Sequence, residues 1–200
     1  MEIKKENVVN AYMAGDNSVK EMLRAMFPDI EFESDNGAEN RPIMERVKTF
    51  EDACRELDFE NPLVVAYNII HTDTFLEDYV EKAQDLIAFL KLRIVCAALN
   101  EGWEPQFAKK DDIRWYPLHS LWTSEELKGK DDVWKRNKHL MSTGDYNTEY
   151  AGFAYDISSI VPSNGYATLG SRLCLKNQAL ADYCGKQFIE LWADFTLIRR

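Results

Sequence analysis

Hydrophobic residues recur at helical spacing in two short stretches near the start of the chain. In the first, Ser18 and Glu21 have the spacing of a capping box, and Pro28 would end the helix that follows. The apolar residues of that stretch are Val19, Met22, Leu23, Met26 and Phe27. In the second, Thr49 is an N-cap residue with Asp52 three positions on, followed by apolar residues on one helical face. Both stretches predict short amphipathic helices.

The longest helical pattern lies at residues 74–99. Thr74 and Glu77 repeat the capping-box spacing, and Gly102 is placed to stop the helix. The apolar positions, spaced mainly three or four apart, are Phe75, Tyr79, Ala83, Leu86, Ile87, Leu90, Ile94, Ala97 and Ala98. The pattern predicts a helix of about seven turns. Because its last third is apolar nearly all round, we expect this helix to form the centre of the core.

Aromatic residues dominate the chain after Gly102. Four of the five tryptophans and five of the nine tyrosines lie between residues 103 and 166, among Gly, Ser, Asn, Pro and Thr. This mixture predicts short strands and loops rather than helices. The two strand candidates are GFAYDISS (152–159) and TLGSRLCLK (168–176). From Asn177, an N-cap residue, helical spacing returns and predicts a closing helix of four to five turns.

These patterns together predict an α+β fold. A helical N-terminal half would pack around the 74–99 helix, and an aromatic-rich, β-containing C-terminal half would be closed by the terminal helix. Two hundred residues, 46% of them hydrophobic, suit one domain over residues 1–200. The acidic, polar stretch at 31–42 indicates a loop or linker, which would set off a helical subdomain at residues 1–36.

The charge of the chain bears on its partners. The formal net charge is −10, and residues 1–100 carry 20 acids against 11 bases, a net of −9. This balance argues against binding to a nucleic-acid backbone, which draws its affinity from lysine and arginine. No apolar window reaches the length of a membrane span or of a signal peptide, so we expect no membrane association and a cytoplasmic location. The four scattered cysteines are expected to be reduced and buried.

No catalytic or metal-binding motif is evident. His71 and Asp73 form an HxD pair, but no second histidine follows at a ligand spacing. Cys184 falls on the apolar face of the predicted terminal helix, where a thiol packs rather than reacts. In the same helix Gly185 indicates the close approach of another segment, or of a ligand. We therefore assign no catalytic residue, no metal ligand and no cofactor.

The candidate binding residues lie in and just after the aromatic region. Trp103, Trp115 and Trp122 are candidate anchors for a partner or a stacking ligand, and Arg114 and Arg172 could hold an anion. Alternatively, the tryptophans supply the core of a region that has few aliphatic residues. Arg172 distinguishes the hypotheses: in a concave pocket beside acids it favours a ligand site, whereas pairing with a surface acid on an edge strand disfavours one.

Several blocks of sequence resemble a known group of proteins. These are KTFEDACREL (48–57), ALNEGWEP (98–105), RWYP (114–117) and GSRLCLKNQALADYCGKQF (170–188). In this order they resemble a group of small uncharacterised proteins of gut Bacteroidetes and of their phages and prophages. The resemblance covers roughly half the chain in blocks, and residues 123–164 form a long polar stretch that the shorter members lack. It implies a mobile-element or phage setting and assigns no residue a role.

Two functional hypotheses from different classes follow. The first is a non-enzymatic binding or interaction protein of a phage or prophage, which binds a host factor or is associated with the virion. Its partner would be another protein, or a second copy of the chain in a homo-oligomer. The alternative is an intracellular enzyme or small-ligand-binding protein acting on a nucleotide, nucleic acid or glycan, using carboxylates such as Glu104, Asp111 and Asp112 with Arg114 or Arg172 to hold an anion. A protein that sequesters a small nucleotide without turning it over is a variant of the alternative.

Overall fold

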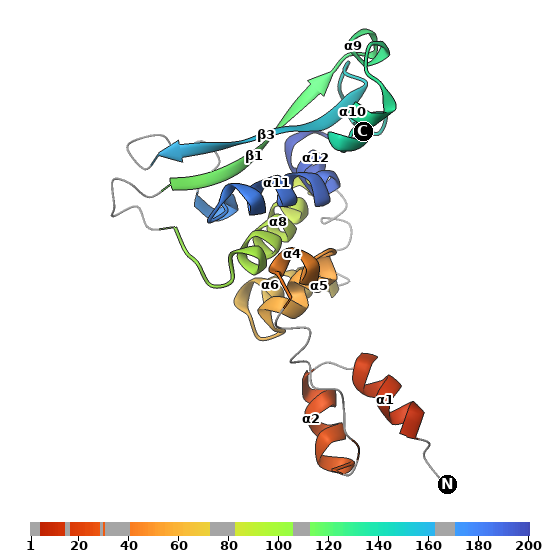
Figure 1. The fold of residues 1–200 in the computed structure, drawn as a ribbon, viewed down its shortest axis with the longest axis vertical. Helices are drawn as coiled ribbons and strands as arrows, with labels where there is room; N and C mark the ends of the chain where they lie inside the picture. Colours follow the sequence, from red (N-terminus) through yellow and green to blue (C-terminus); the bar gives the residue numbers. More distant parts are fainter. Residues whose placement is uncertain are drawn as a thin grey trace. The chain divides into compact units, whose positions relative to one another are not determined.

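The structure is a computed structural model that describes residues 5–14, 17–28, 30, 41–72, 83–105, 113–162 and 171–200. The chain divides into two compact units, Met1–Arg41 and Pro42–Arg200. Its fold is mixed α+β, as the sequence predicts (Figure 1). Among the described residues, no helix is both long enough and apolar enough to cross a membrane.

The first unit contains helices α1 (Lys5–Ala14) and α2 (Asn17–Met26). Val8 and Tyr12 of α1 are buried with Leu23 of α2, and the guanidinium of Arg24 lies 5.2 Å from the centroid of the Tyr12 ring. The predicted helix before Pro28 is confirmed. It begins at Asn17, so Ser18 is a helical residue and not the predicted N-cap.

The second unit begins with three short helices, α4 (Ile43–Arg46), α5 (Phe50–Leu57) and α6 (Pro62–Thr72). The predicted cap of α5 is confirmed. The Thr49 hydroxyl accepts a hydrogen bond from the Asp52 N–H, and the Asp52 carboxylate accepts one from the Thr49 N–H. Helix α6 is not among the predicted elements, because its apolar residues are not confined to one helical face.

Helix α8 (Gln84–Asn100) is the central element, as predicted. Leu92, Ile94, Val95 and Leu99 are fully buried, and the helix contacts α5, α6, α11 and α12. Glu101 ends it in the left-handed conformation (φ 48°), followed by Gly102 (φ 79°), where the sequence predicts the stop. The predicted start at Thr74 lies outside the described residues.

A three-stranded antiparallel sheet packs against α11 (Gln178–Gln187). Its strands, in the order β1-β3-β2, are β1 (Ile113–Trp122), β3 (Gly152–Pro162) and β2 (Met141–Ser142). The predicted strand at 152–159 is confirmed within β3. The expectation of no helices between residues 103 and 166 is wrong: α9 (Ser124–Lys128) and α10 (Asp132–Asn137) lie there. Capping explains both helices, because Thr123 and Asp131 accept hydrogen bonds from backbone N–H groups three residues on.

The predicted strand at 168–176 is wrong over its described part. Residues Ser171–Leu173 form a short 3₁₀ helix, η1, and only Leu175 makes a β-bridge, to Trp115. The Asn100 side chain explains the difference. It donates to the Cys174 carbonyl (2.8 Å) and accepts from the Lys176 N–H (3.0 Å), and so satisfies backbone groups that a neighbouring strand would otherwise satisfy.

The terminal helix is present but divided. Asn177 caps α11 (Gln178–Gln187) as predicted, and α12 (Ile189–Thr196) follows after Phe188, whose backbone leaves the helical range (φ −111°, ψ 33°). Both helices contact α8, and α11 packs on β1 and β3 (Figure 1). The unit therefore has the sheet on α11, α11 and α12 on α8, and α8 on α5 and α6. All four cysteines are free and buried, as predicted.

Candidate functional site

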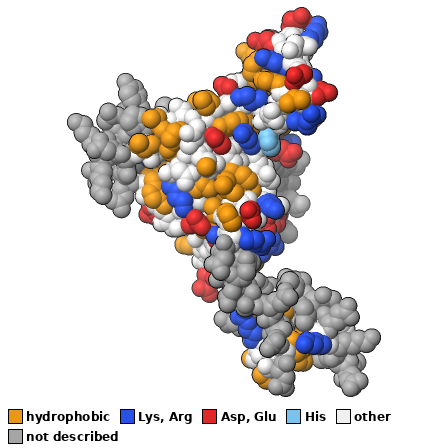
Figure 2. All heavy atoms as spheres, in the orientation of Figure 1, with side chains coloured by type: hydrophobic (Ala, Val, Ile, Leu, Met, Phe, Trp, Pro, Cys, Tyr) orange, Lys and Arg blue, Asp and Glu red, His pale blue; other side chains and the backbone are white. Residues whose placement is uncertain are grey.

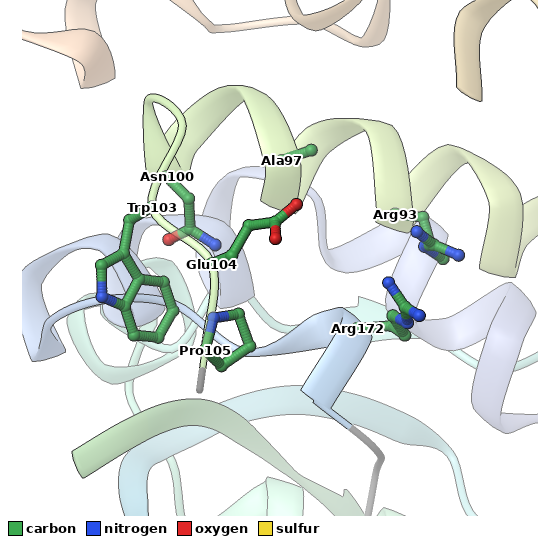
Figure 3. A pocket seen from close by; sticks show the side chains of 7 residues that line it. All are labelled: Arg93, Ala97, Asn100, Trp103, Glu104, Pro105 and Arg172. Atoms are coloured by element: carbon green, nitrogen blue, oxygen red, sulfur yellow. The ribbon is translucent and has the colours of Figure 1, made fainter. Parts of the chain in front are cut away.

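A pocket of about 360 Å³ lies where the C-terminal half of α8 faces the 3₁₀ helix η1 (Figure 3). It is lined by Arg93, Ala97, Asn100, Trp103, Glu104, Pro105 and Arg172. The two arginines lie together at one end, one from α8 and one from η1, whereas Trp103 and Pro105 lie at the other end. The pocket thus joins a cationic end to an aromatic end.

The local sequence explains how α8 forms one wall. Arg93, Ala97 and Asn100 are spaced four and three residues apart, which places them on one face of the helix. The small side chain of Ala97 leaves room between the other two. The left-handed turn at Glu101 and Gly102 then directs the following residues to the tryptophan end.

Ion pairs hold that turn in place. The Glu101 carboxylate lies 2.8 Å from Arg46 and 2.8 Å from Lys176, and the pKa of Glu101 is lowered chiefly by its hydrogen bond to Lys176. Since Asn100 also bonds the backbone on either side of Leu175, the end of α8 is fixed to the segment that follows Arg172. The α8 wall and the η1 wall of the pocket are therefore held together by the bonds of Asn100 and Glu101.

The cationic end is electrostatically unbalanced. Burial lowers the pKa of Arg93, and the nearby Arg172 lowers it further because two like charges repel. Within the described part of the chain neither guanidinium forms an ion pair. Two adjacent guanidinium groups that face a pocket are chemically suited to bind an anion.

Glu104 is the carboxylate that lines the pocket. Its side chain is exposed to solvent and extends along the pocket between the two ends (Figure 3). Among the residues that the structure describes, Glu104 is the one carboxylate that lines the pocket, and the other candidate acids, Asp111 and Asp112, lie outside those residues. Over the described ranges, no three side chains of His, Cys, Asp or Glu come together as metal ligands. The arrangement is suited to binding and orienting a ligand.

The structure brings together two of the predicted site residues, Trp103 and Arg172, in this pocket. Trp115 packs partly buried against the core, and Arg114 is 2% exposed on β1. Trp122 meets the Trp134 ring edge to face, with a centroid separation of 4.9 Å. These three residues lie outside the pocket.

Sequence reasoning missed Arg93, the second cation of the pocket. The signal was present, because this arginine interrupts the apolar run LRIVCAAL on the most strongly predicted helix. A charged residue amid helix positions that are mostly buried indicates a special environment. Its partner could not be foreseen, since Arg172 is 79 positions along the chain and was placed in a predicted strand.

A second pocket, of about 470 Å³, lies at the C-terminus and is a weaker candidate despite its size. Three of its charged side chains, Asp194, Arg199 and Arg200, are already bonded within the protein. Asp194 accepts hydrogen bonds from the Tyr146 hydroxyl (2.6 Å) and from Arg199 Nε (2.8 Å), and Arg200 Nε donates to the Tyr146 carbonyl (3.0 Å). These bonds attach the chain end to the 143–150 loop and serve the fold.

Comparison of the chain with protein-family models, with curated proteins and with solved structures gives no match. The chemistry of the pocket is therefore inferred from its own residues.

Proposed function

We propose that this protein is a small-ligand-binding protein that holds an anionic ligand between Arg93 and Arg172. The observation that carries the proposal is the pair of guanidinium groups, one on α8 and one on η1, that face the same pocket without a carboxylate partner among the described residues. Arg172 lies in a concave pocket with an acid, Glu104, nearby, which is the arrangement that favours a ligand site over a surface ion pair.

Electrostatics supports this proposal. Two like charges held together oppose each other, and a bound anion removes that repulsion while it gains charge-assisted hydrogen bonds. The pocket volume lies within the range of about 300–1,000 Å³ typical of small-molecule sites. Fixed walls reduce the ordering cost of binding, because the turn at Glu101 is already bonded to Arg46 and Lys176.

Isothermal titration calorimetry with inorganic phosphate tests the proposal. We expect saturable binding that weakens at least tenfold in R93Q and in R172Q, since each variant removes one charged donor of the pair. R136Q is the matched control, because Arg136 is an exposed arginine of α10 outside the pocket. Equal loss in all three variants, or no binding to the unaltered protein, would show that the arginine pair is not an anion site.

An interaction role is a second proposal, supported by a different observation. Leu118 and Ile157 are paired in register on β1 and β3, and their side chains are 42% and 55% exposed. Figure 2 shows that hydrophobic side chains are exposed on the visible face of the second unit, residues 42–200. Residues 1–100 carry nine of the ten net negative charges, so Leu118 and Ile157 lie in the nearly neutral half of the chain, where two copies can meet with little repulsion.

Sedimentation velocity tests self-association through this pair. We expect a concentration-dependent dimer that is lost in the double variant L118S/I157S. Exposed Val133 on α10 gives the control V133S, which should keep the dimer. A monomer at every concentration would exclude this second proposal.

A further inference from the structure

The two ends of the pocket demand different chemistry from one ligand. Arg93 and Arg172 form the cationic end, and Trp103 with Pro105 forms the other (Figure 3). Asn100 lies seven positions after Arg93, a rise of about 10 Å along α8 at 1.5 Å per residue, and Trp103 follows beyond the end of the helix. A bare inorganic anion bound at the arginines cannot reach the tryptophan. A ligand that uses the whole pocket must carry an anionic group and a second group some distance from it.

The arginine end favours a phosphate monoester over a carboxylate. Guanidinium groups present planar forks of N–H donors that match the oxygens of carboxylate and phosphate alike, so the charge of the anion decides between the two. A phosphate monoester carries a charge of about −1.5 to −2 near neutral pH. That charge balances two guanidinium groups, whereas a single carboxylate balances one and leaves the repulsion between Arg93 and Arg172 in place.

The tryptophan end favours a planar ring. Trp103 is half-buried, so its position is fixed by the protein while part of the indole faces the pocket. Indole rings stack on the flat faces of nucleobases, whatever the base. Pro105 offers a second apolar surface on the same side, as Figure 3 shows. An aliphatic phosphate would leave this end unused.

Glu104 lies between the two ends and sets a third requirement. A carboxylate accepts hydrogen bonds and repels anions, so the middle of the ligand must donate hydrogen bonds and carry no negative charge. The hydroxyl groups of a ribose meet this requirement. A polynucleotide or a chain of phosphates does not, and the net charge of −10 opposes it as well.

We infer that the pocket binds a nucleoside monophosphate, with its phosphate on Arg93 and Arg172, its ribose hydroxyls at Glu104 and its base against Trp103. This inference rests on the proposed anion-binding function. The pocket volume of about 360 Å³ accommodates one such molecule. The inference assigns the ligand class and the residue that selects it, Trp103, which acts on the base and not on the phosphate.

Calorimetric titration with four probes tests the inference: AMP, ribose 5-phosphate, inorganic phosphate and adenosine. AMP should bind at least tenfold more tightly than ribose 5-phosphate, because only AMP carries the base, and a stacking contribution of about 1.4 kcal/mol corresponds to tenfold. Adenosine should bind weakly, since it lacks the phosphate. Titration with UMP then measures the selectivity for the base.

Three variants assign each contact. W103L should bring the affinity for AMP down to that for ribose 5-phosphate and leave the affinity for ribose 5-phosphate unchanged. W134L, which removes another half-buried tryptophan outside the pocket, should bind AMP like the unaltered protein. Relative to inorganic phosphate, E104Q should weaken AMP and ribose 5-phosphate alike, because both carry the ribose hydroxyls and inorganic phosphate does not.

The outcomes separate the two proposals. Equal affinities for AMP, ribose 5-phosphate and phosphate, all dependent on Arg93 and Arg172 but not on Trp103, would overturn the nucleotide inference and leave the anion site standing. Affinities that do not change in R93Q or R172Q would overturn both. A thermal melt of each variant identifies any loss that comes from unfolding, and W103F, which keeps an aromatic ring, should restore most of the AMP affinity if W103L is unstable.

Discussion

Two regions of the molecule differ in how completely they are filled. One is the junction where α11 packs on the sheet, and the other is the pocket beside η1. Both are built from neighbouring parts of the chain. At Gly185, an added Cβ atom would lie 2.5 Å from Pro117 Cβ and 2.9 Å from the Tyr155 ring, so the junction has no spare room. Thirteen positions earlier, Arg172 borders about 360 Å³ of open pocket. The junction is built for stability, and the pocket keeps space and charge that stability does not require.

The largest expected effect comes from filling the closed junction. G185A should destabilise the protein by about 1–3 kcal/mol, because the added methyl group clashes with Pro117 and Tyr155 and forces the helix away from them. The better helix propensity of alanine, about 1 kcal/mol, offsets only part of that cost. Urea unfolding measures the effect. G129A is the control, since the nearest atom to its added Cβ lies 3.8 Å away; equal effects in both variants would contradict the close packing.

The pH dependence of stability probes the same junction. The His119 ring stacks on Phe153 with centroids 4.8 Å apart and its Nε2 donates to the Gly185 carbonyl at 3.0 Å, while burial lowers the pKa of His119. As the pH falls, the unfolded chain takes up the proton first, near pH 6.5. Stability present above that pH should therefore be lost as the pH falls toward the folded pKa, by about 1.4 kcal/mol for each unit by which the pKa is lowered.

Unfolding in urea between pH 8 and pH 5 checks this sign. Because burial and Lys186 also lower the pKa of His139, the variants H119Q and H139Q separate the two histidines. H119Q should flatten the pH dependence more than H139Q, because His119 is the more deeply buried. A steeper dependence in H119Q would contradict the argument.

Near α10, the ammonium group of Lys130 lies against two tryptophan rings. Lys130 Nζ lies 4.7 Å from the Trp122 ring centroid and 4.9 Å from that of Trp134. K130M should cost about 1 kcal/mol, the sum of two partly exposed cation–π contacts. K128M, which removes only an exposed ion pair to Glu125, should cost less. Thermal unfolding of the two variants compares them, and an equal cost would show that the tryptophan rings contribute nothing to holding Lys130.

Local signals in the sequence predicted the elements that depend on local chemistry. The Thr49 and Asn177 caps, the stop of α8 at Glu101 and Gly102, and the strand at 152–159 each follow from residues a few positions apart. The segment at 171–176 could not be predicted in this way. Its alternating pattern indicates a strand, but Asn100, more than 70 positions earlier, satisfies its backbone and leaves a 3₁₀ turn with one bridge.

The candidate site shows the same limit. Trp103 and Arg172 were candidates because of their residue types, yet nothing local in the sequence indicates that they share a pocket. Arg114 was an equally good candidate for an anion and lies buried on β1 instead. The pairing of Arg93 with Arg172 depends on how the end of α8 meets η1, a long-range contact fixed by the Asn100 side chain and by the bond of Lys176 to Glu101.

The smallest expected change in stability concerns the pocket itself. It tests most directly whether the pocket, unlike the junction at Gly185, is dispensable for stability. R172Q should leave the free energy of unfolding within about 0.5 kcal/mol, and at low salt it should raise it slightly, because the repulsion of Arg93 is relieved. R46Q is the comparison, since Arg46 is paired with Glu56 and Glu101 and its loss should destabilise at every salt concentration. Urea unfolding at low and high salt gives both values. If R172Q destabilised as much as R46Q, Arg172 would serve the fold; if it keeps stability while phosphate binding is lost, the arginine pair is maintained at an electrostatic cost for the sake of a ligand.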